Sequence, residues 1–161
     1  MKTILVPIDF SGATQTVVDS AAGLARSSRA RIVIVHVVQP PAVVADYGPP
    51  IGGFLMPVDG PAGPDAARQL ARWRRYLEAS NIHTETAQLT GASPAKLIAA
   101  EAAARAASYI VMGSHGHTAL YDLIVGGTAS GVLRGAPCPV IIVPARHSAA
   151  RKGASAEVAH A

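Results

Sequence analysis

The strongest constraint on the fold is that several β-branched runs in this chain are apolar at nearly every position. Residues 31–38 read RIVIVHVV, and residues 3–7 and 140–143 are similarly apolar. A strand without polar alternation has to be covered on both faces, as in a parallel sheet between two layers of helices. Ala-rich segments with helical spacing, such as 14–27, lie between these runs. The alternation predicts an open parallel α/β sheet with helices on both faces.

The order of the segments narrows the topology. Strands are expected at residues 3–7, 31–38, 82–90, 109–112 and 140–143, and helices at 14–27, 65–80, 93–107 and 128–134. Ser11 or Thr14 is expected to cap the first helix, and Pro94 suits the first position of the third. Right-handed crossovers leave few arrangements. The economical one is a five-stranded order 3-2-1-4-5, with the 82–90 strand near an edge.

Composition limits the class of protein. The chain has 161 residues, which predicts one domain over residues 1–145, with a Pro/Gly-rich loop at 39–64 and a disordered tail at 146–161. Half of the residues are hydrophobic, yet no apolar run approaches the roughly 18 residues of a membrane span. No signal peptide is expected. The single cysteine, Cys138, excludes a disulfide framework. A cytoplasmic protein without a membrane partner is predicted.

Basic charge does not by itself indicate a nucleic-acid partner. The net charge is +4 and the pI is about 9.6. The densest cluster of arginines is interleaved with Leu70, Trp73 and Leu77 at helical spacing, which favours a solvated helix face. Only 4% of the residues are aromatic, so no stacking platform for single strands is expected. The cluster comprises Arg68, Arg72, Arg74 and Arg75.

The predicted topology indicates where a ligand would bind. Open α/β sheets bind ligands beyond the carboxyl ends of the strands where the strand order reverses, which here means strands 1 and 4. Asp9 follows strand 1 and suits a ribose hydroxyl, while Val37 and Met112 could wall a base. Glycines after strand 4 allow close backbone approach. The helix that starts after Gly126 and Gly127, with Thr128 and Ser130 in its first turn, would offer amides to phosphate.

Spacing alone leaves tight turns as an equally good reading of these glycines. The chain has no Walker A loop, and its first strand–helix turn lacks GxGxxG. His115 and His117 have no partners at metal-ligand spacing, and Ser114 is not in a GxSxG motif. Nothing near Cys138 would lower its pKa. No metal site and no catalytic residue are expected.

A longer match indicates a family. Gly113, Gly116 and Gly126 form G-x2-G-x9-G, and the segments KTILVPIDFS, VIVHVV, YIVMGSHG and GVLRGAPCPVIIVP accompany it. Together these features resemble the universal stress protein family over residues 2–144. The resemblance implies an adenine nucleotide alpha hydrolase-like (Rossmann-like) domain, a regulatory homodimer that binds ATP, either alone or with Mg²⁺. ATP hydrolysis, if any, would be slow.

The resemblance also implies a set of binding residues, with two departures from the family pattern. Gly127 stands where the family usually has Ser or Thr, and His117 where it often has Lys or Arg. A lost neutral hydrogen bond weakens binding by about 0.5–1.5 kcal/mol. The implied nucleotide-binding residues are Pro7, Ile8, Asp9, Val37, Met112, Gly113, Gly116, His117, Gly126, Gly127, Thr128 and Ala129.

Two further readings stay open beside the ATP-binding protein. One is a dimeric interaction module with little nucleotide affinity, and a weaker one is an adenylyl-transfer enzyme. The last strand is short, apolar and expected at a sheet edge, where uncovered backbone groups invite pairing. The sequence therefore predicts a homodimer formed by antiparallel pairing of this strand, which comprises Val140, Ile141, Ile142 and Val143.

Overall fold

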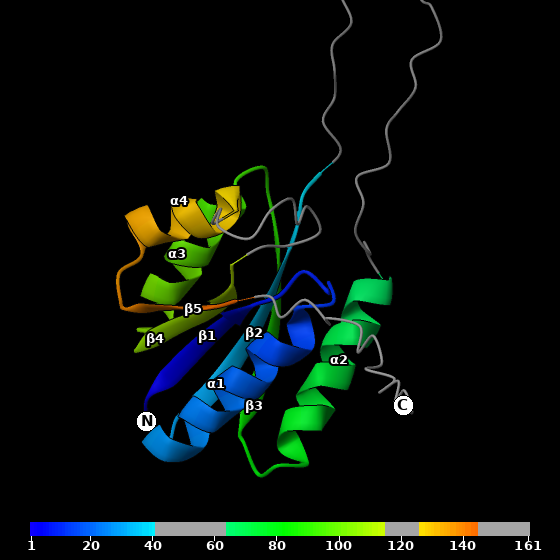
Figure 1. The fold of residues 1–161 in the computed structure, drawn as a ribbon. Helices are drawn as coiled ribbons and strands as arrows, with labels where there is room; N and C mark the ends of the chain where they lie inside the picture. The colour runs from blue at the N-terminus through cyan, green and yellow to red at the C-terminus, as the bar shows by residue number, and fades with distance from the viewer. Residues whose placement is uncertain (41–63, 115–125, 145–161) are drawn as a thin grey trace, which may run out of the picture.

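The protein folds as a five-stranded parallel sheet between two layers of helices (Figure 1). The computed structural model describes residues 1–40, 64–114 and 126–144. The strand order is β3-β2-β1-β4-β5, which confirms the predicted order 3-2-1-4-5 and places β3 and β5 at the edges. The strands are β1 (Thr3–Pro7), β2 (Arg31–Val38), β3 (Thr84–Thr90), β4 (Tyr109–Gly113) and β5 (Val140–Val143).

The helices divide into two pairs, one on each face of the sheet (Figure 1). The first pair, α1 (Thr14–Ser28) and α2 (Pro64–Glu78), packs on one face. The second pair, α3 (Pro94–Ala104) and α4 (Gly127–Gly135), packs on the other. The arginines of the expected basic cluster on α2 are exposed, as the helical spacing indicates. Within the described ranges, no helix is long and apolar enough to cross a membrane.

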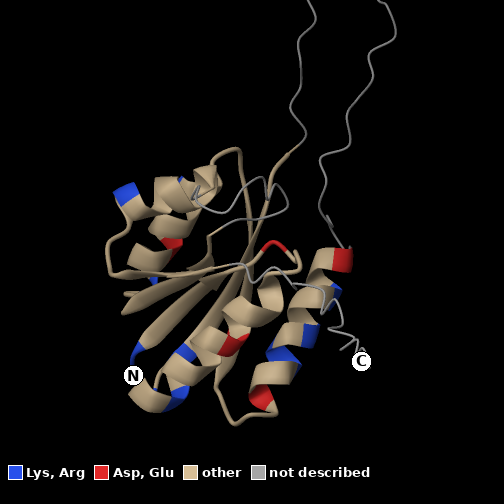
Figure 2. Cartoon of the chain, in the orientation of Figure 1, with Lys and Arg blue, Asp and Glu red and all other residues tan. Residues whose placement is uncertain are grey.

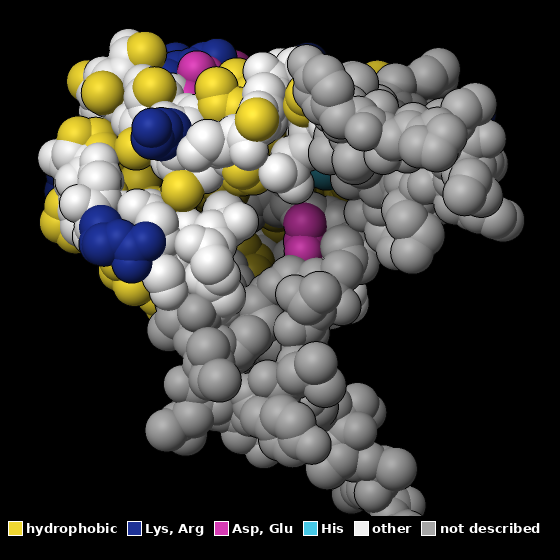
Figure 3. Space-filling view, turned by 90° about the horizontal axis from the view of Figure 1, so that it is seen from above, with side chains coloured by type: hydrophobic (Ala, Val, Ile, Leu, Met, Phe, Trp, Pro, Cys, Tyr) yellow, Lys and Arg dark blue, Asp and Glu magenta, His cyan; other side chains and the backbone are white. Residues whose placement is uncertain are grey.

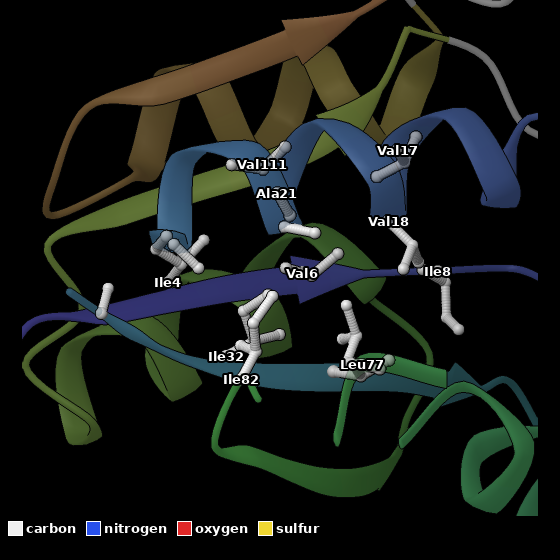
Figure 4. Close-up of a cluster of buried hydrophobic side chains, with 14 of the residues drawn as sticks. Ile4, Val6, Ile8, Val17, Val18, Ala21, Ile32, Leu77, Ile82 and Val111 are labelled. Atoms are coloured by element: carbon white, nitrogen blue, oxygen red, sulfur yellow. The ribbon is translucent and has the colours of Figure 1, made fainter. Parts of the chain in front are cut away.

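Alternation along the strands explains why the β runs are apolar throughout. Ile4, Val6 and Ile32 face α1 and α2, where they form one buried cluster with Val18 and Ala21 (Figure 4). The residues between them in the strands face the opposite way and form a second buried cluster with α3 and α4. The strands β1, β2, β4 and β5 therefore contribute side chains to both clusters, and a strand that is buried on both faces has no polar alternation.

The start of α1 differs from the expected cap. The N-cap is Ala13, with no side-chain cap, so neither Ser11 nor Thr14 caps the helix. Instead the Thr14 N–H donates to the Ser11 carbonyl at 3.0 Å. Thr14 is only 3% exposed because its position in the helix faces the core. The hydroxyls of Ser11 and Thr14 are buried and have no hydrogen-bond partner among the described residues.

Two other boundaries shift because the backbone turns left-handed between the elements. Asn81 has φ 57°, and β3 begins at Thr84 rather than at 82. Ala106 has φ 46°, and α3 ends at Ala104 rather than at 107. Most of the expected 39–64 loop, and the expected tail 146–161, lie outside the described residues.

An ion-pair network closes the amino end of the sheet. Glu85 of β3 receives Arg31 of β2 at 2.7 Å and Arg105, just after α3, at 2.5 Å. Arg105 also pairs with Glu101 of α3 at 2.8 Å. The network joins two strands to a helix at the end of the sheet opposite the carboxyl ends of the strands.

Candidate functional site

The sheet opens between β1, its central strand, and the neighbouring β4 at their carboxyl ends. β1 and β4 are paired in register only up to Leu5 and Ile110. Each strand then continues against its other neighbour, β1 to Pro7 along β2 and β4 to Gly113 along β5. We call this place the β1–β4 opening. It coincides with the reversal of strand order, where α/β sheets bind ligands.

One side of the opening is the loop after β1, which carries an acidic residue (Figure 2). Asp9 is half-buried, and its Oδ1 accepts the Ser11 N–H at 3.0 Å. The peptide between Pro7 and Ile8 is fixed to the sheet, since the Ile8 N–H donates to the Val35 carbonyl at 2.8 Å. Viewed from this end, the surface is hollowed, with acidic side-chain atoms at the hollow (Figure 3).

The predicted apolar wall lies on the α3/α4 side of the sheet. Met112, at 5% exposed, belongs to the buried cluster on that side, and Val37 packs against it. Ala129, in the first turn of α4, joins the same cluster. The side chain of Ile8 is instead buried on the α1/α2 side. The side chain of Ile8 is therefore not part of this apolar wall, and the neighbouring Pro7 is half-buried.

The other side of the opening joins the end of β4 to the start of α4. The Ser114 N–H donates to the Val143 carbonyl at 3.0 Å, and the Gly126 N–H donates to the Ser114 carbonyl at 2.9 Å. The hydrogen bond between Gly126 and Ser114 thus joins the start of α4 to the residue that follows Gly113. Gly116 and His117, also expected at the site, lie outside the described residues.

The first turn of α4 presents backbone donors. Gly126 is the N-cap, without a side-chain cap, and the Ser130 N–H donates to its carbonyl at 2.9 Å. The N–H groups of Gly127, Thr128 and Ala129 come before that bond and have no acceptor within the helix. Thr128 is exposed and Ala129 is 3% exposed. Such a turn, at the positive end of the helix dipole, attracts anions.

Sequence reasoning missed one polar residue at this end of the sheet. His36 is 6% exposed, and its Nδ1 lies 3.0 Å from the Ile8 carbonyl oxygen. Its ring centroid lies 4.4 Å from that of Phe10. The signal was a single polar residue in the otherwise apolar run of β2.

Among the residues that the structure describes, neither an activated cysteine nor a cluster of metal-binding side chains lies at the opening. Burial raises the pKa of the Cys138 thiol, so this cysteine is not activated. Within residues 1–40, 64–114 and 126–144, no group of three or more His, Cys, Asp or Glu could hold a metal ion. His115, considered as a ligand from the sequence, lies outside these ranges.

The fold and the opening define a class: a Rossmann-like α/β domain whose sheet opens at its switch point, the place where sheets of this kind bind ligands. The family model described as the universal stress protein family matches residues 1–144. The chain belongs to the universal stress protein family, as its resemblance in sequence predicted.

Individual relatives agree with this assignment. "Universal stress protein A homolog 1" of Coxiella burnetii is 31% identical over 147 residues, which cover 88% of this chain and 95% of the relative. A universal stress protein of Thermus aquaticus is 30% identical over 152 residues, covering 88% and 98%.

Solved structures have the same fold. A universal stress protein in complex with cAMP has a TM-score of 0.66 at 20% identity, covering 90% of this chain and 98% of the other. One from Archaeoglobus fulgidus in complex with dAMP has a TM-score of 0.62 at 22% identity, covering 88% and 97%.

Proposed function

We propose that this protein is a homodimeric, cytoplasmic regulatory protein of the stress response that binds ATP at the β1–β4 opening. One observation carries the proposal. The sheet separates where Asp9 stands on one side and the uncapped first turn of α4 stands on the other. The carboxylate on one side can accept hydrogen bonds from ribose hydroxyls, and the N–H groups on the other side can donate hydrogen bonds to phosphate oxygens.

The phosphates would bind at the glycine-rich side. The amides of Gly127, Thr128 and Ala129 have no acceptor in α4 and supply donors of the right kind for phosphate oxygens. Gly113, Gly126 and, from the sequence, Gly116 let the phosphates approach the backbone closely. His117 would supply a partial counter-charge, weaker than Lys or Arg near neutral pH. Mg²⁺ could accompany the phosphates.

The nucleoside would bind between the β1 loop and the α3/α4 side of the sheet. A carboxylate repels phosphate but accepts hydrogen bonds from ribose hydroxyls, which assigns the ribose to Asp9. Val37 and Met112 lie on one face and offer apolar contact to a base, with Pro7 and the backbone of Ile8 beside them. The solved universal stress proteins in complex with cAMP and with dAMP hold adenine nucleotides on the same fold, which supports an adenine ligand here.

A regulatory role fits better than an enzymatic one. The described residues around the opening offer one carboxylate and backbone amides, a set suited to binding. ATP hydrolysis, which needs a positioned water and charge stabilisation, would then be slow. Occupancy by nucleotide, rather than turnover, would carry the signal.

The binding proposal is tested with isosteric variants and calorimetry. Asp9→Asn keeps an Oδ1 that can accept the Ser11 N–H, and removes the charge. We expect the Kd for ATP to rise about 10-fold or more, as for other hydrogen bonds to charged groups. Gly113→Val, which blocks close approach, should abolish binding. Asp19→Asn, on the exposed face of α1, is the matched control and should leave the Kd unchanged.

A second function is favoured by one feature of the site. Gly127 supplies no hydroxyl where the family pattern has one, which would suit a dimeric interaction module with little nucleotide affinity. Purified protein that retains no nucleotide, together with no ATP binding in calorimetry, would support the module and contradict the ATP-binding proposal.

A further inference from the structure

A buried imidazole lies directly against the loop that carries Asp9. His36 belongs to β2, is 6% exposed, and has its Nδ1 3.0 Å from the Ile8 carbonyl oxygen. A carbonyl oxygen only accepts hydrogen bonds, so Nδ1 carries the proton and donates. The side chain therefore holds the peptide that immediately precedes Asp9.

Through this hydrogen bond, β2 remains attached to the segment that follows β1. The paired register of the two strands ends at Pro7. The next residue, Ile8, is bound at both of its backbone groups, by its N–H to the Val35 carbonyl at 2.8 Å and by its carbonyl to His36. The attachment thus continues up to the residue next to Asp9.

The same imidazole contacts the residue on the other side of Asp9. Phe10 has φ 60°, a left-handed conformation that is uncommon for a bulky residue. Its ring lies 4.4 Å from the His36 ring, centroid to centroid, with an interplanar angle of 38°. Such a backbone conformation persists only where its surroundings determine it. Asp9 therefore lies between two residues that one side chain holds.

We infer that His36 is a positioning residue, which fixes Asp9 for the ribose hydroxyls of the nucleotide through Ile8 and Phe10. The inference rests on the proposed function, because it concerns the same site. Preorganised groups bind more tightly, since ordering them on binding costs free energy. His36 acts on the ligand only through the loop.

Two variants of His36 separate its hydrogen bond from its bulk. His36→Leu removes the donor and keeps an apolar side chain in the core. His36→Asn restores a donor, because the Nδ2 of asparagine is as many bonds from Cβ as the Nδ1 of histidine. His83→Leu changes an exposed histidine beside the amino end of β3 and is the matched control.

The test has one readout without ligand and one with ligand. Without ligand, amide hydrogen exchange at Ser11 reports its bond to Asp9 Oδ1, and exchange at Ala30, after α1, reports the fold. With ligand, calorimetry gives the ratio of affinities for ATP and 2′,3′-dideoxyATP. We expect His36→Leu to speed exchange at Ser11 about 10-fold, with Ala30 unchanged, and to bring the ratio close to one.

The His36→Asn variant decides whether His36 acts through its hydrogen bond to Ile8 or only through its packing in the core. His36→Asn should recover most of the Ser11 protection and of the ratio, and His83→Leu should match the wild type. The inference is overturned if His36→Leu keeps the wild-type ratio, or if His36→Asn behaves like His36→Leu. If the wild type binds neither nucleotide, the proposed function fails, and exchange at Ser11 alone then decides whether His36 positions Asp9.

Discussion

At the scale of single residues, Gly127 stands where the resemblance in sequence implies Ser or Thr. A Cβ built at this glycine meets no atom within 4 Å. The position is the first residue of α4, beside the uncapped amides proposed to bind phosphate. The glycine is therefore not required by packing, and a hydroxyl could be added there without displacing a neighbour.

Adding that hydroxyl is expected to strengthen nucleotide binding. Gly127→Ser places a donor beside the phosphate subsite, and a neutral hydrogen bond contributes about 0.5–1.5 kcal/mol. The Kd for ATP should fall about 2- to 10-fold in calorimetry. Gly127→Ala, which adds the Cβ without the hydroxyl, should leave the Kd close to that of the wild type. An equal gain for both variants would mean that helix stiffening, not the hydroxyl, is responsible.

Sequence could predict some residues at the opening and not others, for a physical reason. Asp9, Val37 and Met112 follow from strand ends, because parallel strands bring their carboxyl ends to one edge. The role of His36 depends on its contacts with Ile8 and Phe10, which form because the loop after β1 lies against β2. That geometry is set by the left-handed Phe10, which no local pattern in the sequence indicates.

At the scale of elements, α3 and α4 approach each other closely. A Cβ built at Gly131 of α4 would lie 2.6 Å from the Cβ of Ala95 in α3. Real Cβ atoms do not come so close, so the glycine is required at this contact. Since α4 also carries the proposed phosphate amides, this contact sets where those amides stand.

Filling that contact should destabilise the protein. Gly131→Ala forces α3 and α4 apart, and overpacking of this kind costs about 1–3 kcal/mol. Gly23→Ala, in α1, is the matched control, because its Cβ would meet nothing within 4 Å. It should stabilise the protein by up to about 1 kcal/mol through helix propensity. Urea unfolding of the two variants measures the difference, and similar free energies of unfolding would contradict the close packing.

The ion pairs around Glu85 join β2, β3 and α3 and should respond to acid. The hydrogen bond from Arg105 and the charge of Arg31 lower the pKa of Glu85 from its ordinary value of 4.5. A lowered folded-state pKa contributes stability above the ordinary pKa, and this contribution is lost as the pH falls through the folded value. The network is partly exposed, so the contribution is screened.

The measurement compares Glu85→Gln with the wild type. We expect the variant to have the lower Tm at neutral pH, and the difference to shrink as the pH falls from about 7 to about 3. Glu78→Gln, which removes an exposed pair with Arg74 within α2, should change the Tm less. A difference for Glu85→Gln that stays constant with pH would show that its ionisation contributes nothing.

At the scale of the whole molecule, the β5 edge is apolar and partly uncovered. Ile141 is 38% exposed, and its strand pairs on one side only, with β4. An edge of this kind invites pairing with a second chain. The proposed homodimer through Val140–Val143 would cover it.

A charge on this edge is expected to separate the dimer. Ile141→Asp would bury an unpaired carboxylate at the interface, which costs several kcal/mol. The dimer dissociation constant should rise about 100-fold or more in sedimentation equilibrium. Tyr76→Asp, at a residue 44% exposed on α2, is the control and should keep the wild-type assembly. Dimers of unchanged affinity in Ile141→Asp would exclude this edge as the interface.

The whole fold was more predictable than its junctions. Strand positions and order follow from burial on both faces and from right-handed crossovers, and all five strands lie within two residues of expectation. The start of α1 at Thr14 was predicted correctly, but its cap was wrong, because the N-cap is Ala13 and Thr14 faces the core. The Gly131–Ala95 contact depends on a distance between helices, which a single sequence does not encode locally.

The short pairing of β1 with β4 has a mechanical consequence. Every other pair of neighbouring strands is hydrogen-bonded up to its carboxyl end, so the sheet is expected to bend most easily between β1 and β4. A ligand bound both by Asp9, after β1, and by the first turn of α4, after β4, would link the two parts of the sheet across this junction. Nucleotide binding would then reduce the motion of β4 and β5 relative to β1. The β5 edge, where the second chain is proposed to pair, would in this way respond to whether a nucleotide is bound.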